Sequence, residues 1–88
     1  VRAVRERLGD RVAVMSDYNQ RLGWNDAILR GRMLDDEGLV WIEEPVRHDD
    51  YAGSARVAEA LRTPVQTGEN LLNSYEMLQA LQTRAMDY

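Results

Sequence analysis

Three acidic residues recur at a constant interval, each 26 positions after the one before: Asp17, Glu43 and Glu69. Each follows a short, largely apolar run, the pattern of a buried strand that ends in a loop. Carboxylates gathered at one place repel one another, and some must take up protons unless a cation lies among them. Mg²⁺ prefers such oxygen ligands and keeps positions open for water and substrate. The three acids therefore predict a magnesium site.

The strand-like runs alternate with helical patterns. The runs are Val12–Met15, Leu39–Ile42 and Pro64–Thr67, and another apolar run begins near Met86. Alternation of strands and helices predicts right-handed βαβ units and a parallel sheet. The repeat length is typical of an eight-stranded barrel of roughly 250 residues. We therefore expect an α/β fold: a segment of a (β/α)₈ TIM-type barrel with parallel strands, comprising about three βα units and the start of a fourth strand.

Two helix boundaries are signalled locally. Gly38 is expected to stop the helix that precedes it. Asn73 and Glu76 match a capping box, in which Asn73 caps a helix and Glu76 reaches back. The apolar face of that last helix is predicted to be Tyr75, Leu78 and Leu81.

Side-chain alternation is expected to bring the three acids to one face of the sheet. Each acid shares its parity with the residues two and four positions before it, as Glu69 does with Thr67 and Val65. Neighbouring parallel strands lie about 4.8 Å apart, so side chains at three adjacent strand ends can meet. Taken singly, such an acid is as often a solvated loop residue or a helix cap. The metal hypothesis depends on the three being in phase.

Composition excludes several classes of protein. The 11 basic residues, all arginine, and the 15 acidic ones give a net charge of −4, which argues against nucleic-acid binding. No apolar run approaches the roughly 20 residues of a membrane span, and the first residues lack the apolar stretch of a secretory signal. We expect a cytoplasmic protein with no membrane partner. Zero cysteines and one histidine argue against zinc or copper.

Three motifs carry a resemblance to a known family: Asp17-Tyr18-Asn19-Gln20, Trp41-Ile42-Glu43-Glu44-Pro45 and Gly68-Glu69-Asn70. Together they resemble the enolase superfamily, and within it the mandelate racemase subgroup. The resemblance covers essentially the whole chain. It implies that Asp17, Glu43 and Glu69 bind Mg²⁺ and that Asn19 helps to hold the substrate near the metal. It also implies that residues 1–88 are a partial catalytic barrel domain, with a capping domain and the other strands outside this sequence.

The resemblance implies a reaction class. Members of the family remove the proton next to a carboxylate, and the metal stabilises the resulting enediolate. Racemisation or dehydration of a hydroxy acid or sugar acid then follows. Such members take their bases from strands before and after this segment, and the absence of lysine agrees with that, so we expect no catalytic acid or base within it. The implied partners are a small-molecule carboxylate substrate and, for the full-length chain, further copies in a homo-oligomer.

Other residues carry weaker signals. His48 is more simply a loop or helix-cap residue than a base, and Glu44, of opposite parity to Glu43, is expected to pair with an arginine. Asn70 is a candidate to support the third ligand. The acidic run 35–37 reads as a solvated helix end, and Asp87 has no assigned role. Two alternatives stay open: another lyase or cycloisomerase of the superfamily, and a non-catalytic α/β structural or assembly segment.

Overall fold

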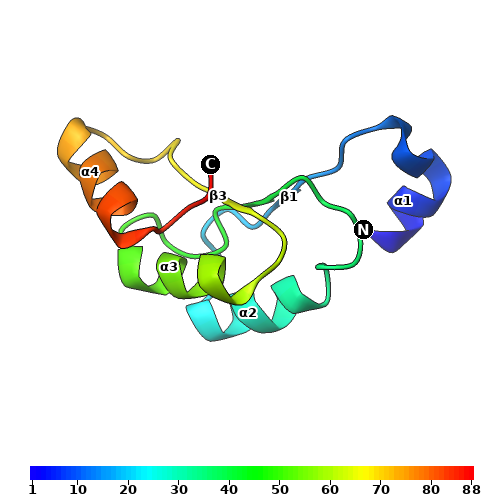
Figure 1. Ribbon diagram of the computed structural model, residues 1–88, viewed down its shortest axis with the longest axis horizontal. Coiled ribbons are helices and arrows are strands. Elements are labelled where there is room, and N and C mark those ends of the chain that lie inside the picture. Colours follow the sequence, from blue (N-terminus) through cyan, green and yellow to red (C-terminus); the bar gives the residue numbers. More distant parts are fainter.

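The computed structural model describes residues 1–88, and its elements alternate as the sequence predicts (Figure 1). A short 3₁₀ turn, Gly9–Arg11, follows the first helix. The other elements in chain order are α1 (Arg2–Leu8), β1 (Ser16–Asp17), α2 (Trp24–Arg32), β2 (Ile42–Glu43), α3 (Tyr51–Ala60), β3 (Val65–Gln66) and α4 (Ser74–Thr83). The longest helices have ten residues, about half of what a membrane-spanning helix needs.

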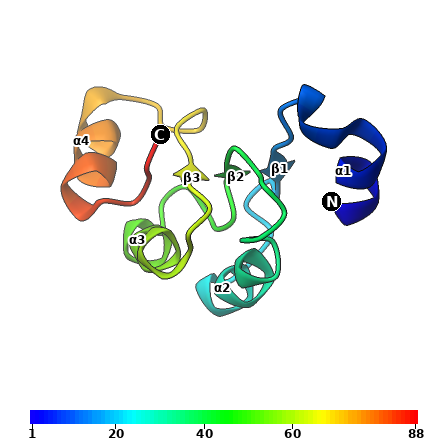
Figure 2. The ribbon, with the colours of Figure 1, turned by 45° about the vertical axis from the view of Figure 1, so that its right-hand side comes forward.

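The three strands form one parallel sheet in the order β1-β2-β3 (Figure 2). Ser16 pairs with Ile42 and Ile42 with Val65, while Asp17 pairs with Glu43 and Glu43 with Gln66. The paired strands are two residues long: β1 lies just beyond its predicted run, β2 overlaps the end of its run, and β3 lies within its run. The α/β prediction with parallel strands is confirmed.

A fourth segment begins beside β3. The Tyr88 N–H donates to the Val65 carbonyl at 3.2 Å, and the Thr67 N–H donates to the Tyr88 carbonyl at 3.4 Å. This is the hydrogen-bond pattern of a further parallel strand. Asp87, to which the sequence assigned no role, accepts a hydrogen bond from the Val65 N–H through Oδ2 at 2.8 Å. Its carboxylate therefore holds the start of β3.

Helices α2 and α3 cover one face of the sheet, whereas α1 and α4 lie beyond its two ends (Figure 2). The core beneath α2 and α3 consists of Ala27, Val46, Val57 and Val65. Ile42 on β2 is 1% exposed. Gly31 of α2 lies against Leu61, so close that a Cβ there would collide with the leucine side chain. The lack of a side chain at Gly31 allows this close approach.

The opposite face of the sheet has no helix over it, and the molecule is open and elongated. Met15 on that side is 46% exposed. The accessible surface of 5903 Å² exceeds the roughly 5,300 Å² expected of a compact monomer of this mass. The extents of 41 × 23 × 19 Å are far from spherical. The sheet thus presents one covered face and one open face.

The local helix signals are confirmed in part. The Asn73 side chain accepts hydrogen bonds from the Tyr75 and Glu76 N–H groups, both at 3.0 Å, as a helix cap should. Glu76 reaches back to the N–H of Leu72 at 2.7 Å rather than to that of Asn73. Helix α2, which Gly38 was expected to stop, already ends at Arg32, six residues before Gly38. Gly38 has a positive φ of 66° and turns the chain toward β2 instead.

The predicted apolar face of α4 is not buried in this structure. Tyr75, Leu78 and Leu81 are 80%, 50% and 58% exposed, and the buried residue of the helix is Ala80. Helix α4 packs beside α3, at one edge of the sheet rather than over its face. Its larger apolar side chains remain at the surface.

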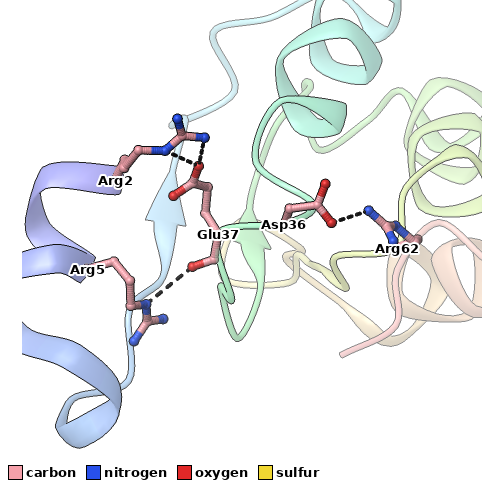
Figure 3. Close-up of polar contacts among 5 residues, drawn as sticks. All are labelled: Arg2, Arg5, Asp36, Glu37 and Arg62. Atoms are coloured by element: carbon pink, nitrogen blue, oxygen red, sulfur yellow. Dashed lines mark hydrogen bonds and ion pairs between the residues drawn. The ribbon is translucent and has the colours of Figure 1, made fainter.

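The acidic run 35–37 is not the solvated helix end that the sequence suggested. Asp35 accepts hydrogen bonds from the N–H groups of Arg62 and Thr63 at 3.1 and 2.8 Å. Asp36 pairs with Arg62, and Glu37 pairs with Arg2 of α1 (Figure 3). Burial of the Asp35 carboxyl favours its neutral form, but the hydrogen bonds from Thr63 and Arg62 outweigh this and lower its pKa below the ordinary value. The run joins α2 to α1 and to the start of β3.

Candidate metal centre

Asp17 and Glu43 are direct neighbours across the sheet. They are paired in the parallel register of β1 and β2, each as the last residue of its strand. Paired residues of parallel strands direct their side chains to the same face, about 4.8 Å apart. Ile42, which is 1% exposed, points to the face that α2 and α3 cover. Asp17 and Glu43 therefore lie on the opposite face. The structure therefore brings two of the three predicted ligands to one edge and one face.

Glu69 reaches this edge by another route, and the parity prediction is wrong for it. The register partner of Glu43 on β3 is Gln66, so Val65 faces the helices and shares its side with Ile42, not with Glu43. Glu69 lies in the turn after β3, beyond Gly68, whose φ of 148° suits glycine. The strand has ended before Glu69, so alternation no longer determines its direction.

The three carboxylates are not gathered into one cluster. No group of three or more histidine, cysteine, aspartate or glutamate side chains lies close enough together to hold a metal ion. Asp17 and Glu69 are exposed, and Glu43 is half-buried. The backbone places the three acids at or just beyond the carboxyl ends of adjacent strands, but it does not bring all three carboxylates together.

Two of the acids are held by neighbours within their own segments. Asp17 Oδ1 accepts a hydrogen bond from the Asn19 N–H at 2.7 Å, and Asn19 adopts a left-handed φ of 48°. Asparagine tolerates this conformation better than most residues. The Asn19 side chain itself is exposed, next to Asp17. The predicted substrate-binding residue thus lies beside the first predicted ligand.

Glu43 is oriented by a tryptophan. The indole Nε1 of Trp41 donates to Glu43 Oε2 at 3.2 Å. The Trp41 ring in turn packs against Tyr88, with ring centroids 6.1 Å apart. Sequence reasoning missed this hydrogen bond, although the parity that Trp41 shares with Glu43 signals that the two side chains lie on one face.

The most buried polar residue of the site is Glu44, which is 2% exposed. Its Oε1 accepts from Asn70 Nδ2 at 2.8 Å, and its Oε2 lies 3.3 Å from Gln20 Nε2, which donates to it. The predicted arginine partner is therefore wrong, and two amides take its place. Asn70, which the sequence placed beside the third ligand, supports the site through Glu44. Sequence reasoning missed Gln20, because nothing local marks it as a partner of a residue 24 positions away.

His48 is a loop residue, as the sequence suggested. Its backbone N–H and its Nδ1 both contact Gln20 Oε1 at 3.0 Å. Since that oxygen can only accept, Nδ1 carries a proton in this arrangement. The imidazole is thereby tied to the loop after β1.

The donor set fits a hard divalent cation. The strand ends supply carboxylate oxygens, which Mg²⁺ prefers, and neither thiol nor free imidazole competes with them. Gln66, the register partner of Glu43, also has a buried side-chain oxygen, Oε1, with no hydrogen-bond partner. Buried polar atoms are nearly always paired, so an orphaned oxygen beside Glu43 agrees with a site that takes a ligand.

Comparison with known proteins settles the family. The family model described as Enolase C-terminal domain-like matches residues 1–88. The chain belongs to this family. L-talarate/galactarate dehydratase of Salmonella typhimurium is 43% identical over 98% of the chain, which covers 22% of that protein. L-Ala-D/L-Glu epimerase of Bacillus subtilis is 34% identical over 99% of the chain, which covers 24% of that protein.

Solved structures agree with this assignment. L-talarate dehydratase from Polaromonas sp. JS666, complexed with Mg and L-glucarate, superposes with a TM-score of 0.94 at 41% identity, over 98% of this chain and 23% of that one. An enolase from Bradyrhizobium, complexed with magnesium and mandelic acid, also superposes with a TM-score of 0.94. It is 38% identical over 97% of this chain and 24% of that one. The chain thus spans about a quarter of the length of its relatives. The prediction of the enolase superfamily is confirmed, and the two solved structures hold the metal that the sequence predicts.

Proposed function

We propose that this family member supplies the metal ligands of a Mg²⁺-dependent enzyme that removes the proton next to a carboxylate. The reaction leads to racemisation or dehydration of a hydroxy acid or sugar acid. The observation that carries the proposal is the pairing of Asp17 with Glu43 at the carboxyl edge of the parallel sheet. In barrels built of such units, this edge is where active sites lie.

The proposed ligands are Asp17, Glu43 and Glu69. The first two share a face and an edge, and the turn at Gly68 leaves the third free to come across from the end of β3. When bound, Mg²⁺ supplies fixed positive charge where negative charge develops on the substrate carboxylate. The relatives support this, since two solved structures hold magnesium together with glucarate or mandelic acid.

The chain's other residues hold these groups in place. Trp41 donates to Glu43 and so limits the directions that its carboxylate can take. Asn19 is exposed beside Asp17, and its side-chain amide can donate to an oxygen of the substrate. Neither residue moves a proton. We assign the catalytic acid and base to other strands of the protein, since this segment has no lysine and its one histidine is bound to Gln20.

The experiment is proton exchange at the substrate carbon. The intact protein, with and without Mg²⁺, is incubated in D₂O with a panel of α-hydroxy acids and sugar acids, including mandelate and glucarate. Loss of the α-proton signal by NMR is expected only with Mg²⁺. Inverted stereochemistry indicates a racemase, and a keto acid indicates a dehydratase. Absence of Mg²⁺ binding in calorimetry, with no exchange on any acid, would refute the proposal.

A further inference from the structure

Glu44 is a buried carboxylate that the proposed reaction does not use. It is 2% exposed, and its φ of 39° shows that the chain turns out of β2 at this residue. Burial of a charged group is costly unless hydrogen bonds replace its water. Here the two oxygens accept from two amides, Asn70 Nδ2 and Gln20 Nε2, at 2.8 and 3.3 Å.

The amides come from the loops on either side of Glu44. Gln20 belongs to the loop after β1, and Asn70 to the loop after β3. The Gln20 N–H also donates to the Glu44 carbonyl at 2.8 Å, and the Glu44 N–H donates to the Gln66 carbonyl at 3.0 Å. One residue thus joins three consecutive strand-end loops.

Each of these loops contains one proposed ligand or directly follows it. Asn70 follows Glu69 directly, Glu44 follows Glu43 directly, and Gln20 lies three residues after Asp17. An ionised carboxylate only accepts, so both of its oxygens can be satisfied by amide N–H donors. The arrangement is directional: a donor in place of either acceptor would face another donor.

We propose that Glu44 is a positioning residue, which clips the loops after β1, β2 and β3 together and so sets the spacing of the carboxylates that receive the divalent cation. The metal part of this proposal rests on the proposed function; the clip does not. Groups that orient metal ligands from outside typically contribute about 10- to 100-fold to metal affinity. Loosening the clip should therefore weaken Mg²⁺ binding without removing a ligand.

The test uses two asparagine-to-alanine variants of the intact protein. Asn70→Ala removes the donor to Glu44 without changing charge. Asn73→Ala, three residues on, removes the cap of α4 and is the matched control for loss of stability. Two quantities are measured. The first is hydrogen exchange, in metal-free protein, of the Tyr18 and Gln20 amides, which donate to the Glu43 and Glu44 carbonyls at 3.0 and 2.8 Å. The second is the Kd for Mg²⁺ by calorimetry. We expect Asn70→Ala to speed this exchange and raise the Kd about tenfold, and Asn73→Ala to lower Tm with neither effect.

A polarity swap supplies the second arm. Asn70→Asp sets two carboxylates face to face, whereas Glu44→Gln combined with Asn70→Asp restores a donor–acceptor pair at unchanged net charge. The double variant should regain the slow exchange of Tyr18 and Gln20 that Asn70→Asp alone loses.

The outcomes separate the two proposals. Unchanged Tyr18 and Gln20 exchange in Asn70→Ala, or no recovery in the double variant, would overturn the clip. If Asn70→Ala speeds the exchange but has the same Kd for Mg²⁺ as Asn73→Ala, the proposal that Glu44 positions the metal ligands would be overturned. If the unaltered protein binds no Mg²⁺, the proposed function fails, and the exchange data alone decide the clip.

Discussion

Asp17 and Glu43 face each other across β1 and β2, and each carboxylate accepts a hydrogen bond from a residue two positions away in its own segment. Asp17 accepts from the Asn19 N–H at 2.7 Å, and Glu43 accepts from the Trp41 indole at 3.2 Å. Two like charges at neighbouring strand ends repel, so the pair is costly unless a cation or protons compensate it. This pairing is the basis of the first prediction.

Substitution of Glu43 should impair metal binding more than substitution of its neighbour. Glu43→Gln removes an anionic oxygen donor, whereas Glu44→Gln disturbs only the hydrogen bonds that position the loops. In calorimetry on the intact protein, we expect Glu44→Gln to raise the Kd for Mg²⁺ about tenfold and Glu43→Gln to raise it clearly further. Equal effects would contradict the assignment of Glu43 as a ligand.

The 88-residue chain alone should not turn over any α-hydroxy acid. A positioned acid or base usually contributes about 10²- to 10⁴-fold to rate, and we place both outside this segment. The assay is product formation from mandelate and glucarate with millimolar Mg²⁺. Measurable turnover by the purified chain would mean that a base lies within it, and His48 would be the first residue to replace.

The same chain alone should not form a well-packed monomer. Only 15 of its 88 residues are buried, and one face of the sheet is uncovered, with Met15 on that face 46% exposed. An open sheet also offers its edges to other chains. We expect broad NMR signals or concentration-dependent association in sedimentation. A dispersed spectrum with a cooperative melt at monomer mass would show that the segment is self-sufficient, and would favour the non-catalytic alternative.

The free energy of unfolding should fall at acid pH in part because Asp35 takes up a proton there. Its pKa in the folded state lies below the ordinary value of 3.8, so the unfolded state binds its proton first as pH falls. Its contribution is therefore fully present above that value and is lost as pH falls through the folded pKa. Asp35→Asn keeps an acceptor for Arg62 and Thr63 but loses the charge.

The measurement is urea unfolding of the intact protein from pH 6 to pH 2. At pH 6 the free energy of unfolding should be about 1 kcal/mol higher for the unaltered protein than for Asp35→Asn. This is the difference in strength between charged and neutral hydrogen bonds. This gap should close at the acid end. Asp36→Asn, in an exposed pair with Arg62, controls for the loss of one charge. A gap that widens toward low pH would contradict the assignment.

Arg5 should stabilise the junction between α1 and the turn before β2. Its guanidinium donates to the carbonyls of Gly9, Val12, Glu37 and Gly38 (Figure 3 shows the contact with Glu37). A lysine keeps the charge but lacks this planar set of donors. We expect Arg5→Lys to lower the free energy of unfolding by about 1–3 kcal/mol. Arg7→Lys on the same helix is the control, and an equal loss there would contradict the role of Arg5.

Local signals sufficed for the order of elements and for the ends of some of them. The βα alternation and the Asn73 cap follow from periodicity and from hydrogen bonds within three residues, so the sequence alone predicts them. The positions of Asp17 and Glu43 at the carboxyl edge follow in the same way, because alternation of parallel strands and helices brings all strand ends to one side.

Only the tertiary structure decided the register and the long-range contacts. It pairs Glu43 with Gln66 rather than with a residue of Glu69's parity, because a register is set by packing of the whole strand against its neighbours. It joins Glu44 to Gln20 and Asn70, and Asp35 to Arg62 and Thr63, across 24 to 28 positions. No local pattern marks such partners, since burial makes a polar group pair with whichever donor the fold brings near.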